Sequence, residues 1–405
     1  MRPSLVPGVL ALGLLSVFPA FGATDAQLAE IRNEIRDLKA TYESRIQALE
    51  ERLRAAESAA PAAAPSSAGN SASAFNPAIS AILAGTYANL SRDPASFSIP
   101  GFARGGEIGP GRRGFGLGES ELALSANVDP HFAGTLIVSV TPEDTIAVEE
   151  AYGQYLTAPL GLAPKFGRFL SGIGYLNEQH SHVWDFVDAP LAYQAFLGGQ
   201  YRTDGVQVKW VAPIDQFVEL GAEAGNGDAF PGAQRSRNGA GASAFYAHAG
   251  GDIGESQSWR AGASYLNTGS QVDGVNARSR VGIADFVWKY APNHNALANS
   301  LKLQGEYISG RIRDQSRQDG WYLQGVYQFM PEWRVGARVE RLDPRGVDDV
   351  SYAPRKSSVM VDYNPSEFSR IRLQLARSQV QPDLADNQVF VQYILSLGAH
   401  GAHRY

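Results

Sequence analysis

The chain has no cysteine among its 405 residues, so no disulfide framework can hold it together. After the N-terminus it also lacks any apolar run of the ~18 residues that a membrane-spanning helix needs. The net charge of −6 provides no basic surface for a nucleic acid. Glycine, with 43 residues, and aromatic residues, at 10%, are plentiful instead. Abundant glycine and aromatics without long apolar runs are typical of a β-barrel that crosses a membrane.

The first 23 residues contain the three parts of a secretory signal in order. Arg2 supplies a positive charge, residues 9–18 are apolar, and Ala20-Phe21-Gly22 forms the small-x-small pattern that precedes cleavage. The segment is too short for a transmembrane helix with its flanks. The alternative is a buried N-terminal helix. We expect residues 1–23 to be a signal peptide and the mature chain to be exported.

Residues 24–58 follow a helical period. Leu28, Ile31, Ile35, Leu38 and Tyr42 are three or four positions apart, and charges of both signs flank them. So narrow an apolar stripe is marginal on a lone helix, and mixed flanking charges favour a coiled coil. The alternative is one amphipathic helix packed on the rest of the chain. The coil predicts a homotrimer, with a dimer as the alternative, because the apolar positions do not decide the number.

Residues 59–75 are rich in Ala, Pro and Ser and carry no charge, which indicates a flexible linker. A linker between a membrane barrel and a periplasmic coil makes peptidoglycan a further candidate partner.

The hydrophobic period changes to two in residues 76–405. In the segment 333–340, Trp333, Val335 and Val339 share one face, and Arg334 and Arg338 share the other. Such alternation predicts strands with one apolar and one polar face. The predicted strands are 78–89, 119–128, 131–141, 147–156, 163–169, 204–211, 217–224, 242–253, 258–267, 279–290, 300–308, 320–329, 333–341, 356–364, 369–378 and 387–398.

These segments have lengths near the ~9–11 residues of a tilted membrane strand, and short turns alternate with longer polar connections. The sequence therefore predicts an all-β transmembrane barrel of about 16 antiparallel strands, preceded by an N-terminal α-helical coiled coil. A soluble β-sandwich is the alternative, since its strands also alternate.

The last strand, "NQVFVQYILSLGAH", and the terminal Tyr405 resemble the end of bacterial outer-membrane proteins, which the outer-membrane assembly machinery recognises. The whole barrel segment resembles the outer-membrane porin superfamily. With its coil and long third loop it is similar to phosphate-selective porins, although acids interrupt the basic ladder of that family. "SGIGYLNEQHSHVWDF" and "GAHGAHRY" resemble proteobacterial proteins labelled zinc-regulated or TonB-dependent outer-membrane receptors, but no segment leaves room for a plug domain.

The resemblance implies a location in the outer membrane of a Gram-negative bacterium, in contact with its lipid, with the coil in the periplasm. It implies passive diffusion of small hydrophilic solutes or ions through a water-filled channel. We expect no enzymatic activity, because no Ser-His-acid set is apparent on one outer wall.

The longest predicted connection is the third outer loop, residues 170–203. In the trimeric porins that the chain resembles, this loop folds inward and narrows the channel. Charges of both signs inside the wall imply water, because burying them unpaired is costly. We expect Trp184 and Phe186 to fix the loop to the wall. The residues predicted to line the constriction are Glu178, His180, His182 and Asp185 of the loop, and Glu121, Lys209, Arg334, Arg338 and Arg372 of the strands.

His180 and His182 also form an H-x-H motif beside acids. Zn²⁺ favours histidine nitrogen and needs about four ligands, which Glu178 and Asp185 could complete. The sequence fixes no third ligand, so we expect no cofactor, with zinc as the alternative. In that alternative the protein is an uptake channel selective for a metal ion or chelate, and the loop histidines capture it.

Overall fold

The computed structural model describes residues 78–102, 108–140, 145–233, 238–272, 275–292, 295 and 299–398. All of them belong to the second of two compact units, Ala72–Tyr405. The predicted signal peptide, coiled coil and linker, and the terminal Tyr405, lie outside the described residues. Within these ranges, no helix has both the length and the apolar composition to cross a membrane.

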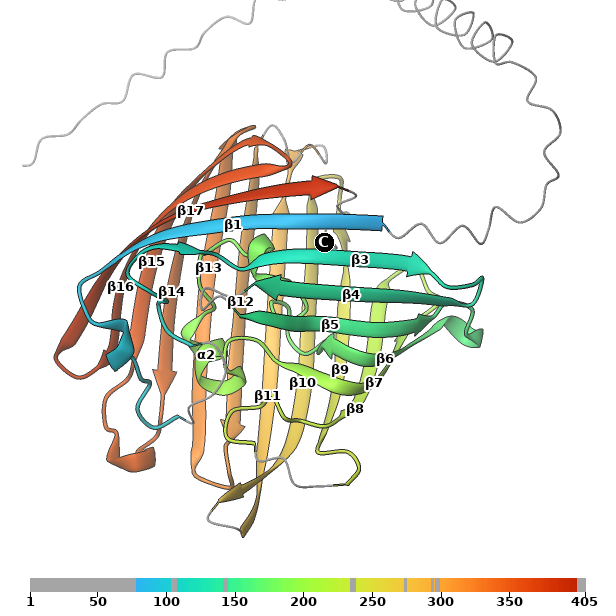
Figure 1. Ribbon diagram of the computed structural model, residues 1–405, viewed down its shortest axis with the longest axis horizontal. Helices are drawn as coiled ribbons and strands as arrows, with labels where there is room; N and C mark the ends of the chain where they lie inside the picture. Colours follow the sequence, from blue (N-terminus) through green and yellow to red (C-terminus); the bar gives the residue numbers. More distant parts are fainter. Residues whose placement is uncertain are drawn as a thin grey trace, which may run out of the picture. The chain divides into compact units, whose positions relative to one another are not determined.

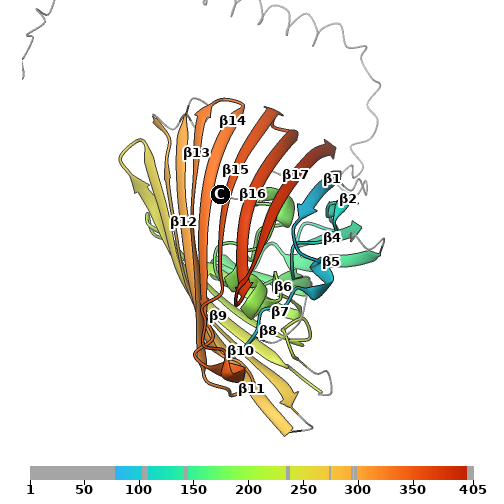
Figure 2. The same cartoon turned by 90° about the vertical axis from the view of Figure 1, so that its left-hand side faces the viewer.

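The described strands form one antiparallel sheet that closes on itself (Figures 1 and 2). They are β1 (Ala78–Leu90), β2 (Gly114–Leu117), β3 (Ser120–Asn127), β4 (Phe132–Val140), β5 (Ile146–Tyr155), β6 (Leu162–Leu170), β7 (Arg202–Val211), β8 (Phe217–Gly225), β9 (Ala242–Ile253), β10 (Gln257–Val272), β11 (Val275–Tyr290), β12 (Ser300–Arg311), β13 (Arg317–Met330), β14 (Trp333–Asp343), β15 (Arg355–Ser366), β16 (Ser369–Gln381) and β17 (Leu384–Gly398). The short helices are η2 (Pro94–Ser96), η3 (Pro159–Gly161), η4 (Ser181–Val183), α2 (Leu191–Leu197) and η6 (Val347–Asp349).

The seam of the barrel is the pair β1–β17, and the other edge of β1 pairs with β2 and β3. Since β2 and β3 share one place beside β1, the 17 segments occupy 16 strand positions. The predicted strand number is confirmed. The sequence missed β2 and the full length of β10 and β11, whose hairpin continues to Val272 and Val275. The sequence of residues 268–278 does not alternate between apolar and polar types, so the period of two is no longer visible.

The wall of the barrel is apolar outside and polar inside. Leu303 of β12 and Leu373 of β16 are exposed, while their neighbours Gln304 and Gln374 are buried. A soluble sandwich has the opposite arrangement, with its apolar face buried. The sandwich alternative is therefore wrong, and the outer surface is one that lipid would solvate.

A β-bulge in β5 changes which side chains face inward. Ile137 of β4 pairs with Glu150, but the next residue, Val138, pairs with Val148, so Glu149 is an extra residue. A bulge interrupts the alternation of faces. Both Glu149 and Glu150 are consequently buried, where a strict period of two allowed only one of them to face inward.

The connection between β6 and β7, residues 171–201 and here called loop 3, lies inside the barrel. Its helix α2 lies beside β12, β13 and β14 and ends at Gly198, whose φ of 70° is left-handed (Figure 1). Tyr193 and Phe196 of α2 are buried in one hydrophobic cluster with Ile283 and Ile308 of the wall. Loop 3 thus gives the interior of the barrel a packed core.

Candidate functional site

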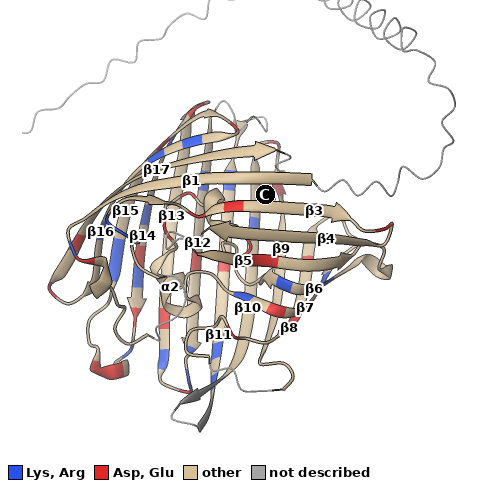
Figure 3. Cartoon of the chain, viewed as in Figure 1, with Lys and Arg blue, Asp and Glu red and all other residues tan. Residues whose placement is uncertain are grey.

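Loop 3 lies between walls of opposite charge. Acidic residues are found on β3 and β5, and basic residues on β14, β15 and β16 (Figure 3). The loop presents histidines to the first wall and aspartates to the second. This complementarity determines how the loop is held.

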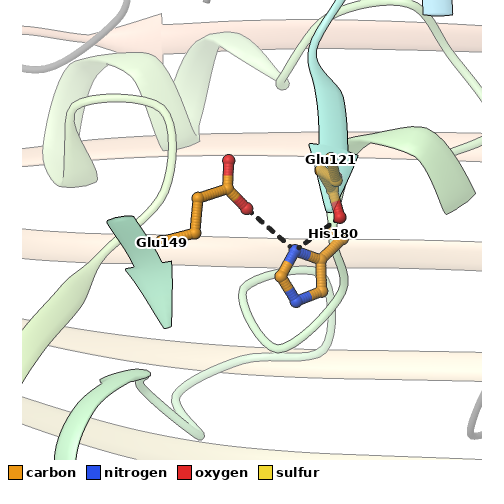
Figure 4. Close-up of side chains that lie close together, drawn as sticks. All are labelled: Glu121, Glu149 and His180. Carbon is orange, nitrogen blue, oxygen red and sulfur yellow. Dashed lines mark hydrogen bonds and ion pairs between the residues drawn. The ribbon is translucent and has the colours of Figure 1, made fainter. Parts of the chain in front are cut away.

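His180 faces the acidic wall with both of its ring nitrogens. Its Nδ1 lies 3.0 Å from Oε2 of Glu149 and 3.5 Å from Oε2 of Glu121 (Figure 4). Its Nε2 lies 3.3 Å from Oε2 of Glu150. The bulge in β5 is what brings two consecutive glutamates to the same imidazole.

The neighbours of His180 add to this cluster. Nδ1 of His182 lies 2.8 Å from Oε1 of Glu121, and the hydroxyl of Ser181 donates to Glu119. The two imidazole rings stack with centroids 5.8 Å apart. Two histidines therefore meet a group of glutamates: Glu119, Glu121, Glu149 and Glu150.

Burial by itself lowers the pKa of His180. The hydrogen bonds to Glu149 and Glu150 and the charge of Glu121 outweigh burial, so the pKa lies well above its usual value. His180 is therefore an imidazolium at neutral pH, and its charge offsets part of the acidic wall.

The two loop aspartates face the basic wall. Asp185 forms ion pairs with Lys302 of β12 and Arg334 of β14. Burial alone raises its pKa, but these two cations hold the pKa below the usual range. Arg372 of β16 donates to the backbone carbonyl of Trp184 at 3.0 Å, which fixes the adjacent turn of the loop.

Asp188 is the second aspartate. It accepts from Arg338 of β14 at 3.0 Å, from Gln374 of β16 at 2.8 Å, and from Lys356 of β15. Its pKa is also below the usual range, because the Lys356 and Arg338 charges outweigh burial. The guanidinium of Arg338 lies 4.6 Å from the ring centre of Phe186, which packs in a buried cluster with wall side chains.

A third attachment is the carboxylate of Glu306 on β12. It accepts from the backbone N–H groups of Tyr175 and Leu176 and from the hydroxyls of Tyr193 and Tyr322. Glu306 is buried, so each of these bonds replaces one that water would have made. It connects the start of loop 3 to α2.

All nine residues predicted to line a constriction face the inside of the barrel, and each contacts loop 3 or belongs to it. Of the residues that could complete the alternative zinc site, Glu178 pairs with Lys209 of β7 and Asp185 with the basic wall. In the described part of the chain, one group of three residues places metal-ligating atoms within 4.8 Å of one another, and it consists of Glu121, Glu149 and His180.

Sequence reasoning passed over several residues that hold the loop. Asp188 lies in the loop beside Asp185, and its acidic side chain was a visible signal. Lys356 has the inward parity of its strand. Glu119 has the same parity as Glu121, whereas the joint burial of Glu149 and Glu150 depends on a bulge that no sequence pattern showed.

Raising the pH should loosen the acidic side of loop 3. The pKa of His180 is raised in the folded state, so its stabilisation is complete below about pH 6.5 and is lost as pH rises through the raised value. The ionisable groups facing it are the four glutamates and His182. We expect the protection from hydrogen exchange at residues 178–184, taken relative to the intrinsic exchange rate at each pH, to fall at alkaline pH, measured with a chelator present.

The matched variants are H180Q, which should lose this pH dependence, and H131Q, which should keep it. His131 lies in an exposed turn and contacts Thr157. Identical exchange profiles for H180Q and the unmodified chain would refute the assignment to His180.

No known family model matches the chain. An uncharacterized protein of Aquifex aeolicus (strain VF5) is 29% identical over 392 residues, which cover 82% of this chain and 80% of that protein. Solved structures with a similar fold include the anion-selective porin of Comamonas acidovorans, with a TM-score of 0.55 and 13% identity, covering 80% of this chain and 99% of the porin.

Two further structures have the same fold. The trimer form of in-vitro folded OmpT, an outer-membrane protein of Vibrio cholerae, has a TM-score of 0.52 and 12% identity, covering 80% of this chain and 99% of OmpT. The outer-membrane channel DcaP of Acinetobacter baumannii has a TM-score of 0.51 and 12% identity, covering 80% and 97%. The likeness shows that the chain has a porin-type barrel fold.

Proposed function

We propose that the chain forms an outer-membrane channel through which small hydrophilic solutes or ions diffuse passively, and that loop 3 narrows it. The proposal is supported by the closed barrel with an apolar exterior and a polar interior, and by the porins and channels among similar folds. The observation that carries it is the position of loop 3 inside the barrel, between an acidic and a basic wall. Such a field across the passage orients polar solutes as they cross.

The narrow part should show only a weak preference for ion charge, because the two walls carry opposite signs. Single-channel recording in planar bilayers tests both parts of the proposal. We expect stepwise conductance and, in a salt gradient, a reversal potential close to zero. A folded, reconstituted chain that gives no conductance steps would exclude a channel.

We further infer a homotrimer, located in the outer membrane and in contact with its lipid, with residues 24–58 as a periplasmic coil. The coiled-coil pattern and the trimer form of one similar barrel support this assembly. Crosslinking of the detergent-extracted chain, with and without residues 24–58, counts the subunits. A chain that stays monomeric in both forms argues against the trimer.

Selective uptake of a metal ion or chelate is a second candidate, favoured by the imidazole of His180 on the loop and the carboxylates of Glu121 and Glu149 on the wall. This second candidate predicts that zinc crosses faster than other divalent ions. In liposomes containing a zinc-sensitive dye, Zn²⁺ should enter faster than Mg²⁺ enters matched liposomes with a magnesium dye. Equal rates for the two ions argue for a general channel instead.

A further inference from the structure

We propose that Glu121, Glu149 and His180 bind one divalent transition-metal ion of the Zn²⁺ class at the junction between loop 3 and strands β3 and β5. The ion is a resident of the protein and fastens the loop. This inference goes beyond the channel function and does not depend on it.

The spacing of the three ligand atoms fits such an ion. Zinc binds histidine nitrogen and carboxylate oxygen at about 2.0–2.2 Å, so neighbouring ligands of a tetrahedral site lie about 3.3 Å apart. Nδ1 of His180 lies 3.0 Å from Oε2 of Glu149 and 3.5 Å from Oε2 of Glu121. All three atoms lie within 4.8 Å of one another, so small rotations of the glutamate side chains close the site (Figure 4).

The proposed ligands are held by hydrogen bonds from neighbouring residues, as metal ligands commonly are. A ligating histidine commonly donates its other N–H to a carboxylate, which fixes its tautomer. Glu150 is placed to accept from Nε2 of His180, and the backbone N–H of Leu170 holds the other oxygen of Glu150 at 3.0 Å. His182 contacts Oε1 of Glu121, which leaves Oε2 of that carboxylate directed at His180.

A second observation concerns the hydrogen-bond partners of the buried glutamate carboxylates. Glu149 is only 5% exposed, no N–H or hydroxyl group of the described residues donates to its Oε1, and the carboxyl of Glu119 is its hydrogen-bond partner besides His180. Two buried carboxyl groups in contact must share a proton unless a cation lies beside them. A divalent cation bound to Glu149 replaces that shared proton.

The donor set narrows the choice of ion. One imidazole nitrogen and two carboxylate oxygens, with no sulfur, suit Zn²⁺ and comparable divalent ions better than Cu⁺. Binding requires the lone pair of Nδ1, so the proton on Nδ1 leaves to solvent. The proton on Nε2 stays on the ring and is donated as a hydrogen bond to Glu150. The ion then takes over the attachment that protonated His180 provides without it.

The test is zinc binding to the full, untagged chain in detergent, after removal of metal with a chelator. The C-terminal His400 and His403 are replaced by alanine in every sample, because they form a second motif able to bind zinc. Isothermal titration with Zn²⁺ alone should give one tight site per chain. E149Q and H180A should abolish that site, and E150Q, which acts behind the ligand, should weaken it about 10–100-fold.

H131A is the matched control, because it removes an exposed histidine outside the cluster, and it should bind as tightly as the parent. Resistance of the folded barrel to SDS at room temperature confirms that each variant has assembled. If H180A does not fold, the nearly isosteric E149Q still decides the question. Undiminished binding by folded E149Q, or no tight site in the parent, overturns the proposal whether or not the chain conducts.

Discussion

Replacing residues 172–200 with a short Gly-Ser turn is expected to raise the single-channel conductance several-fold. This segment fills part of the barrel interior with a packed core and two sets of ion pairs. Its removal leaves that volume to electrolyte. The wall should still close, because β6 and β7 are paired directly from Leu162 and Trp210 to Leu170 and Arg202.

Excision within the β14–β15 connection, residues 345–353, is the matched control. Arg345 in that connection is half exposed and pairs with Asp319 at the start of β13. We expect its conductance to stay near that of the unmodified chain. If the loop-3 excision folds and conducts no better than this control, loop 3 does not narrow the channel.

The second large effect is expected from D188A, which should detach the basic side of loop 3. Lys356 and Arg338 are buried, and D188A removes the carboxylate that both of them contact. Removing one partner of a buried ion pair costs about 3–5 kcal/mol, because the remaining charge stays uncompensated. Hydrogen exchange at residues 185–200 should accelerate correspondingly, and channel currents should become noisier.

The double variant D188A/K356M separates this cause from a general loss of packing. It removes the uncompensated lysine, while Arg338 keeps its pairing with Glu340 at 2.8 Å. Much of the protection from hydrogen exchange at residues 185–200 should return. D215N, in a short exposed turn, should behave like the unmodified chain. A D188A variant with unchanged exchange contradicts the role given to Asp188.

Acid should act on the same contact in the unmodified chain. The pKa of Asp188 is lowered in the folded state, so its stabilisation is present above about pH 3.9 and is lost as pH falls through the lowered value. The aspartate contacts thus weaken in acid and the His180 contact weakens in alkali. The His180 and Asp188 contacts of loop 3 are intact together only between these limits.

The strands were predictable because lipid and water impose a simple rule on a barrel wall. Under this rule apolar side chains face outward, toward lipid, and polar side chains face the interior. Leu303 is exposed on the outside and Gln304 is buried inside, as the rule requires. The same rule placed Lys209, Arg334 and Arg372 inward. It fails where the sequence does not alternate between apolar and polar residues, as in residues 268–278, and where a bulge intervenes, as at Glu149.

The partners of loop 3 could not be predicted by this rule, because strand parity says which face a residue occupies and not what it meets. Glu178 and Asp185 lie close to the histidines in sequence, yet they turn to Lys209 and to Lys302. The carboxylates that do reach His180 come from two other strands. Their meeting depends on the register of the sheet and on the path of the loop, which only coordinates supply.

The distance along the chain between loop 3 and its partners has a consequence for assembly. Tyr193 meets Glu306, 113 residues later, and Trp184 meets Arg372, 188 residues later. Contacts so distant in sequence form late, since the intervening chain must first be ordered. The buried residues of α2, 191–197, therefore lack their partners until β12, β13 and β14 have been ordered. That interval is when the unfinished barrel is most prone to aggregation.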